Sequence, residues 1–300
     1  MASLASNAYF NFLAFSPNNI AVGDYFLAFA GLLGGLGAFL IGVKLMSDSI
    51  SKIANRGLRK MFDKLSNNKL AGIGIGLSTT AIIQSSAVTT VMVIGFVNAG
   101  IMSLTQATAV IMGANIGTTV TAQIAALQGF DFIAYAVILT VVGIFINMLA
   151  KRDRVKTIGM ILAGLGIVFV SLNYMSISMK IFSGADSPIQ AFFQQISNPF
   201  LLLAVGIIFT ILMQSSSALT VVLIAMVNAG IVIGGGGNSA LYIVLGSNIG
   251  TCFTALLSTV GTSANAKRAG VIHLLFNVFG SLLFMIVLLC WKDFNDVLFV

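Results

Sequence analysis

The sequence predicts an all-α polytopic membrane protein built from two inverted-topology repeats, each with a re-entrant helical hairpin and a broken transmembrane helix. Two observations carry this prediction. First, 58% of the 300 residues are hydrophobic and only 8% are charged, whereas soluble domains carry about 25% charged residues. Second, one polar motif occurs twice in this otherwise apolar chain, which indicates an internal duplication.

The duplicated motif begins with Gln-Ser-Ser in both copies. Residues 84–101 and 214–231 align at a constant offset of 130, with eleven of the 18 positions identical. A second motif, Asn-Ile-Gly-Thr, follows at 115–118 and 248–251. Polar residues in membrane helices often only join helices, but packing alone rarely requires two such motifs in the same order. The motifs therefore mark the candidate functional residues.

The elements of each half follow in the same order. A Gly-rich apolar helix leads through a more polar connection to the Gln-Ser-Ser segment, then to a helix interrupted at Asn-Ile-Gly-Thr and to a last apolar helix. In the first repeat, 25–150, these elements are 25–46, 47–69, a hairpin at 70–99, a broken helix at 102–127, and 132–150. In the second repeat, 157–290, they are 157–175, 176–198, a hairpin at 199–229, a broken helix at 239–260, and 269–290. Apolar helices of about 20 residues cross roughly 30 Å of hydrocarbon.

Each Gln-Ser-Ser segment allows two structures, a straight membrane helix or a re-entrant hairpin with arms of roughly 13 residues. The charges favour the hairpin. Twelve of the 15 Lys and Arg residues lie in 51–69, 151–156 and 261–268. Hairpins place all three segments on one side of the membrane, with the N-terminus outside, as the positive-inside rule requires. A straight helix would put 51–69 opposite 151–156.

The distribution of charge also excludes several functions. The net charge of +7 lies in loops and forms no face for nucleic acid. No nucleophile–base pair or metal-ligand cluster occurs in the sequence, so no enzyme is expected. Residues 70–130 and 187–266 contain no Asp, Glu, Lys, Arg or His. Whatever the motifs bind, they bind it with amides, hydroxyls and backbone groups.

Helix ends explain what such a site could bind. A helix that begins at a hairpin tip offers free N–H groups and a positive dipole end to an anion. The carbonyls that end the preceding helix suit a hard cation such as sodium. Gly117 and Gly250 would give the backbone freedom that a break at Asn-Ile-Gly-Thr needs. Because an anion is costly in an uncharged membrane site, co-bound sodium is expected. Proton coupling is disfavoured, and for His273 packing and functional roles both stay open.

With these motifs and the stretch Val271–Asn277, the chain resembles the type II sodium–phosphate cotransporter family in its bacterial branch, over roughly residues 25–290. The resemblance implies a symporter of the cell membrane that couples sodium influx to the uptake of inorganic phosphate by alternating access. It implies no cofactor, since sodium is a co-substrate. It also implies a phosphate site at Ser85, Ser86, Ser215 and Ser216.

The resemblance further implies sodium sites. These carry over to Gln214, Ser215, Thr251 and Thr254, with Asn248 close by, and by repeat symmetry Gln84, Asn115, Thr118 and Thr121 line the opposite wall. Asp131 lies near a position that tunes sodium binding in some relatives, so the stoichiometry stays open.

Two alternatives remain at this stage. The first is a sodium-coupled symporter of another oxyanion or a dicarboxylate. The second is a structural or sensory membrane protein whose polar clusters only hold helices together. The sequence leaves the oligomeric state open, a homodimer included.

Overall fold

A computed structural model describes residues 22–63, 68–127, 133–184, 187–291 and 294. The described residues form helices joined by short loops and contain no strand, which confirms the all-α class. In chain order the elements are α2 (Val22–Asp63), α3 (Lys69–Ile83), α4 (Ser86–Asn98), α5 (Leu104–Gly117), α6 (Thr119–Ala126), α7 (Ile133–Leu149), α8 (Asp153–Met179), η2 (Lys180–Ser183), α9 (Pro188–Gln195), α10 (Pro199–Met213), α11 (Ser216–Asn228), α12 (Ser239–Ser258) and α13 (Ala264–Cys290).

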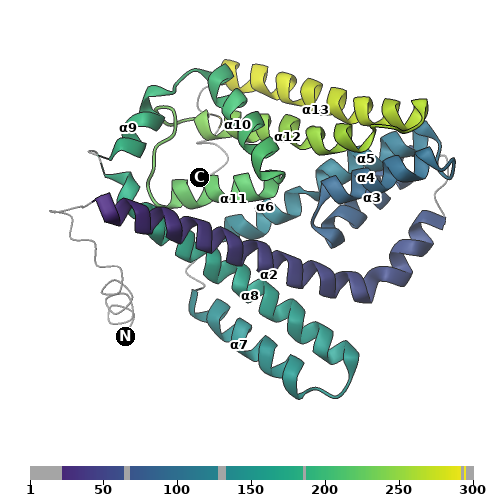
Figure 1. Cartoon of the computed structure of the whole chain (residues 1–300), viewed down its shortest axis with the longest axis horizontal. Coiled ribbons are helices and arrows are strands. Elements are labelled where there is room, and N and C mark those ends of the chain that lie inside the picture. The colour runs from purple at the N-terminus through teal and green to yellow at the C-terminus, as the bar shows by residue number, and fades with distance from the viewer. Residues whose placement is uncertain (1–21, 64–67, 128–132, 185–186, 292–293, 295–300) are drawn as a thin grey trace.

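Helices α2, α7 and α8 form one side of the molecule. Helix α2 packs along α8, and α7 covers the other face of α8 (Figure 1). Glycines allow the close approach: a Cβ on Gly42 would lie 2.9 Å from the Gly164 carbonyl oxygen, and one on Gly159 would lie 2.6 Å from that of Gly143. The Gly-rich helices predicted at 25–46 and 157–175 therefore pack against each other.

A second type of helix pair occurs once in each half. Helix α3 packs along α5, and α10 packs along α12. In both pairs, two glycines let each helix approach a backbone carbonyl of the other, and the contacts correspond at the offsets of the sequence motifs. The glycine-to-carbonyl contacts are Gly76 to Val110, Gly113 to Ile73, Gly206 to Ile243 and Gly246 to Leu203.

The predicted helix breaks at Asn-Ile-Gly-Thr are only partly correct. In the first half, α5 and α6 are separated at Thr118, which keeps right-handed helical dihedrals (φ −65°, ψ −25°). In the second half the prediction of a broken helix at 239–260 is wrong, since α12 runs unbroken. Neither Gly117 nor Gly250 has a positive φ. Their missing side chains instead make room for neighbours, because a Cβ would lie 2.8 Å from Cβ of Thr80 or Thr210.

Within the described residues, five helical segments are long and apolar enough to cross a membrane: Gly23–Ala54, Leu104–Ala126, Asp153–Ser183, Ser239–Ser258 and Ala264–Cys290. The chain is therefore a multi-pass membrane protein. The helices on either side of the Gln-Ser-Ser motifs, α3, α4, α10 and α11, have only 13 to 15 residues each. At 1.5 Å per residue they are roughly 20–23 Å long, too short to span. The inverted repeats and re-entrant hairpins stay predictions.

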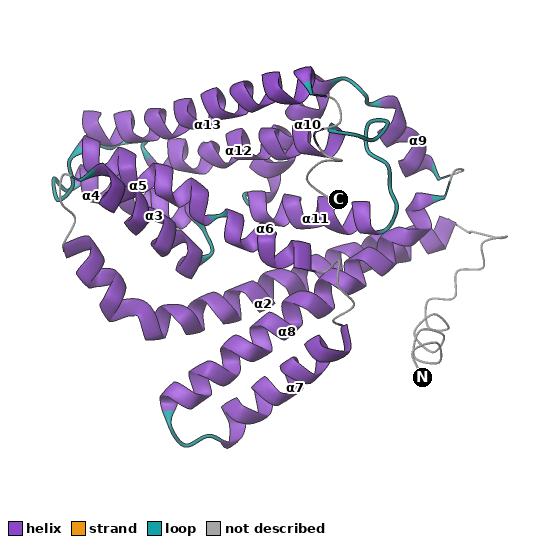
Figure 2. Cartoon of the chain, turned by 180° about the vertical axis from the view of Figure 1, so that it is seen from behind, coloured by secondary structure: helices purple, strands orange, loops and turns teal. Residues whose placement is uncertain are grey.

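The basic segments gather at one end of the molecule. The end of α2, the α7–α8 turn and the α12–α13 turn lie at the right in Figure 1 and at the left in Figure 2. The start of α2 and helix α9 lie at the opposite end in both views. This is the arrangement of charge on which the predicted topology depends.

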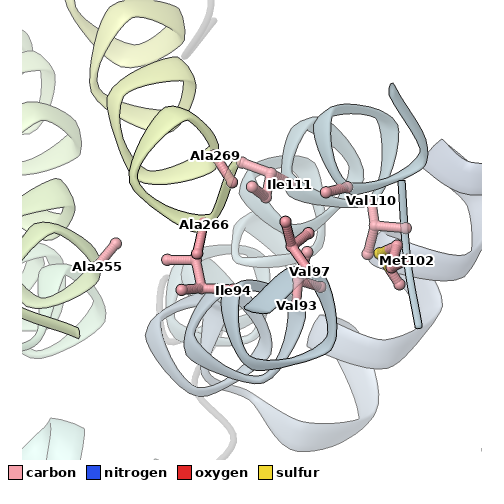
Figure 3. Packing of buried hydrophobic residues seen from close by; sticks show 10 residues of the cluster. Val93, Ile94, Val97, Met102, Val110, Ile111, Ala255, Ala266 and Ala269 are labelled. Atoms are coloured by element: carbon pink, nitrogen blue, oxygen red, sulfur yellow. The ribbon is translucent and has the colours of Figure 1, made fainter. Parts of the chain in front are cut away.

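The two halves interlock through the helices that follow Gln-Ser-Ser. Helix α4 packs against α12 and α13 of the second half, and α11 packs against α6 of the first half. Figure 3 shows one resulting core, where α4, α5, α12 and α13 meet. Its fully buried members are Val93, Ala107, Val110, Ala255, Ala266 and Ala269. Each half therefore contributes to the packing of the other half's motif.

Candidate functional site

The two Gln-Ser-Ser tips share one unusual backbone conformation. Gln84 ends α3 with φ 56° and ψ 26°, and Gln214 ends α10 with φ 52° and ψ 25°. Among the described residues these are the only non-glycine residues with a positive φ. The left-handed conformation costs an L-residue roughly 1–2 kcal/mol. A strained geometry that recurs at the same place in both halves indicates a functional constraint.

The serine after each glutamine caps the next helix. Ser85 and Ser215 are extended (φ −149° and −152°), and their Oγ atoms accept from the N–H groups of Val88 and Ala218 over 3.3 and 3.1 Å. This bond occupies one donor of the first turn, while the N–H groups before it have no partner within the helix. Each tip therefore aims backbone donors and a positive dipole end out of the helix start.

The first tip is anchored to its surroundings through Gln84. Its Nε2 donates to the Ala81 carbonyl at the end of α3. Its Oε1 accepts from Thr121 Oγ1 on α6 over 2.7 Å. Two of the predicted site residues, Gln84 and Thr121, are thus brought into direct contact.

A residue that the sequence analysis missed completes this anchor. Ser47, buried in α2, donates to the Ile83 carbonyl over 2.7 Å, and the Ile82 carbonyl lies 3.3 Å from the same Oγ. The last carbonyls of α3 therefore already accept a hydrogen bond from Ser47, and each keeps one lone pair for the cation expected there. A signal for Ser47 exists, because Ser176 follows it at offset 129, as Gly164 follows Gly35.

The second tip has fewer contacts. Gln214 is exposed, and in the described part of the chain its side chain makes no hydrogen bond. In the first half, Thr80 Oγ1 donates to Thr89 Oγ1 over 3.0 Å, which joins α3 to α4 beside the tip. The corresponding hydroxyl of the second half, on Thr210, is buried and has no partner among the described residues, since position 219 is leucine.

The threonines of the two Asn-Ile-Gly-Thr motifs make the same contact in both halves. Thr118 and Thr251 each donate to the carbonyl one turn earlier, over 3.2 and 2.9 Å, which leaves the hydroxyl oxygen free to coordinate. Thr254 is half-buried and Asn248 is exposed. No ligand contact tests these residues, so their roles stay predictions, and Asp131 lies outside the described residues.

Asn115 contacts His273 in the other half. The Nε2 atom of His273 on α13 lies 3.3 Å from Asn115 Oδ1 on α5. His273 is fully buried, and Asn277 Nδ2 donates to its backbone carbonyl over 2.9 Å. This polar cluster was not predicted as a unit, because its members come from distant parts of the sequence.

The site is electrically neutral. The one ion pair found between described residues joins Lys44 and Asp48 at 3.2 Å, and both side chains are exposed on α2. The tips therefore offer hydroxyls, amides and helix ends, as the composition of 70–130 and 187–266 predicts.

Comparison with known proteins matches residues 38–177 and 180–299 to the family model described as Na+/Pi-cotransporter. An uncharacterized protein of Bacillus subtilis, YqeW, is 30% identical over 246 residues, which cover 81% of this chain and 76% of the relative. A protein of Escherichia coli K12 named putative inorganic phosphate export protein YjbB is 27% identical over 255 residues, 85% of this chain and 46% of the relative. Human sodium-dependent phosphate transport protein 2B is 34% identical over 99 residues, 32% of this chain and 14% of the relative. The chain thus spans less than half the length of YjbB. No solved structure matches.

Proposed function

Since this chain belongs to the Na+/Pi-cotransporter family, we propose that it couples sodium influx to the uptake of inorganic phosphate. It is a multi-pass protein of the cell membrane. The names of its relatives support phosphate as a substrate, and the human relative's name supports sodium dependence.

The observation that carries the proposal is the shared geometry of the two tips. Each starts a helix with a serine cap and an uncharged set of donors, which suits an oxyanion. Charge in a membrane interior is expensive unless it is paired. Sodium bound beside the anion would offset much of that cost, so the absence of Lys and Arg from both segments favours cotransport over an anion uniporter.

In this proposal the residues divide into two sets. Phosphate contacts Ser85, Ser86, Ser215 and Ser216. Sodium contacts Gln214, Ser215, Thr251 and Thr254 with Asn248 nearby, while Gln84, Thr118 and Thr121 line the opposite wall. Asn115, which by repeat symmetry lines the same wall, also contacts His273, and its role is developed below.

We also propose the transport cycle. The repeats are inverted, the Gln-Ser-Ser segments are re-entrant hairpins, and both tips reach the middle of the membrane. Sodium binds first and completes the anion pocket. One repeat then moves against the other to open the site to the opposite side. A homodimer is compatible with this cycle, which needs only one chain.

Uptake of labelled phosphate into proteoliposomes tests the function. We expect uptake to require a sodium gradient and to stop when choline replaces sodium. Equal uptake in both salts would refute sodium coupling. In Ser216→Leu, a bulky side chain at the start of α11 should abolish uptake while the purified protein keeps its elution volume and melting temperature.

Two alternatives give different outcomes in the same assay. Competition by sulfate or succinate as strong as that by unlabelled phosphate would favour another oxyanion or a dicarboxylate as the substrate. The name of YjbB indicates export. Vesicles loaded with phosphate and given a sodium gradient of either direction separate uptake from export.

A further inference from the structure

His273 and Asn115 form a contact between the two halves. This contact has no role in the phosphate and sodium sites proposed above. The ring nitrogen Nε2 of His273 lies 3.3 Å from Oδ1 of Asn115. An amide oxygen can only accept, so in this contact the neutral imidazole carries its proton on Nε2 and donates. His273 is the chain's single histidine, and none of its surface is exposed.

The contact leaves the other end of the asparagine amide without a partner. Asn115 Nδ2 is buried and has no hydrogen-bond acceptor among the described residues. A buried donor without an acceptor is strongly unfavourable. The amide oxygen of Asn115 is bound within the protein, so its buried NH2 group is left to donate to a ligand.

The directions of α4, α5 and α13 show which residues lie near the Asn115 amide. At one end of the bundle, the Ser263 N–H at the start of α13 donates to Asn98 Oδ1 at the end of α4 over 2.8 Å. From this end α13 runs toward its C-terminus. Helix α4, followed from the same end against the chain direction, leads to its own N-terminus. Helix α5 leaves the same end, because only a short loop joins it to α4. Followed away from this end, all three helices pass the apolar core of Figure 3, with α4 antiparallel to α5 and α13.

Beyond that core, each helix carries a polar residue at a similar height. Ser86 lies two helical turns beyond Val93 on α4, and Asn115 lies about one turn beyond Ile111 on α5. His273 lies about one turn beyond the core on α13. The free NH2 group of Asn115 thus lies in the same layer as the N-terminus of α4, which is one wall of the proposed phosphate site.

The arrangement exists only once in the molecule. The counterpart of Asn115 is Asn248, which is exposed. The counterpart of His273 at offset 130 is Gly143 on α7, which packs against Gly159 and Ala163 of α8. The anion site is therefore asymmetric in its amide donors, although the tips have the same backbone.

We infer that His273 is a positioning residue: it holds the Asn115 amide by its oxygen, so that the NH2 group donates to the transported oxyanion at the start of α4. This inference rests on the proposed function. It transfers Asn115 from the sodium set to the phosphate set, because the buried side-chain atom that lacks a partner among the described residues is the NH2 nitrogen, a donor that suits an oxyanion and not a cation.

Four variants test the inference by their Michaelis constants for phosphate and for sodium in proteoliposomes. H273N cannot place a donor where Nε2 lies, and we expect its KM for phosphate to rise about tenfold with the KM for sodium within about twofold. H273Q places an amide N–H near the position of Nε2 and should recover most of the affinity. N115D replaces the donor by a carboxylate and should raise the KM for phosphate further. S281A, which removes a buried bond from α13 to the Leu245 carbonyl, should lower the melting temperature without changing either KM.

The outcomes distinguish a failure of the proposed function from a failure of the role assigned to His273 and Asn115. If the wild type takes up no phosphate with sodium, the proposed function fails. If the wild type is active but N115D lowers the KM for sodium and spares that for phosphate, Asn115 is a sodium ligand and the inference is overturned. Equal values for H273N and H273Q, or a loss of melting temperature alone, would reduce His273 to a packing residue. Calorimetric titration of the solubilised variants with inorganic phosphate gives the same comparison for variants that bind without transporting.

Discussion

The anchor between α2 and the first tip makes a quantitative prediction for Ser47→Ala. The change removes the 2.7 Å bond to the Ile83 carbonyl and the longer one to Ile82, while the volume of the side chain hardly changes. Hydrogen bonds in membrane proteins contribute about 0.6 kcal/mol on average and up to about 1.7, and a buried carbonyl left unpaired costs about 1–3 kcal/mol. We expect a loss of about 1–2 kcal/mol at the end of α3.

This loss should appear in ligand affinity, because the bond orders the residue immediately before Gln84. At 1.4 kcal/mol per factor of ten, the KM for phosphate should rise roughly five- to thirtyfold. Uptake of labelled phosphate over a range of concentrations measures this. Ser49→Ala is the matched control, since Ser49 is equally buried on the same helix and makes no hydrogen bond to the tip within the described chain. Equal phosphate affinity in the two variants would refute the anchoring role of Ser47.

Two further predictions concern stability, measured as the melting temperature of the purified protein. Thr80→Val should destabilise by about 1 kcal/mol because it breaks the bond to Thr89, whereas Thr210→Val removes a buried hydroxyl that has no partner and should be neutral or stabilising; the reverse order would contradict this account. Gly113→Ala forces a Cβ against the α3 backbone and should cost about 1–3 kcal/mol. Gly95→Ala meets open space within a helix, and should stabilise by about 0.5–1 kcal/mol; a similar loss in both glycine variants would rule out the packing explanation.

The sequence predicts the tips well because the signal is local. A Gln-Ser-Ser motif between two apolar arms contains its own cap, since Ser85 bonds within the next turn. Local sequence reasoning gave the wrong role for Gly250, where it predicted a helix break. A glycine in a membrane helix either breaks the helix or lets another helix approach, and only the position of Thr210 on α10 decides between these roles.

The contacts that sequence reasoning missed join residues far apart in the chain. Ser47 contacts a carbonyl 36 residues away, and His273 contacts an amide 158 residues away. Neither contact follows from a motif, because no spacing rule links a serine in one membrane helix to the end of another. Repeat symmetry finds Ser47 through Ser176, but it cannot find His273, whose counterpart is a glycine.

The interlocked halves also have a consequence for ancestry. Helix α4 packs against α12 and α13 of the second half, and α11 packs against α6 of the first half, so each tip helix rests partly on residues encoded by the other half. If the halves arose by duplication, a single-copy ancestor lacked these contacts within one chain, and a pair of identical chains could have made them instead. Fusion of the two copies then freed each half to change alone. The histidine on α13, whose counterpart in the first half is a glycine on α7, records that divergence.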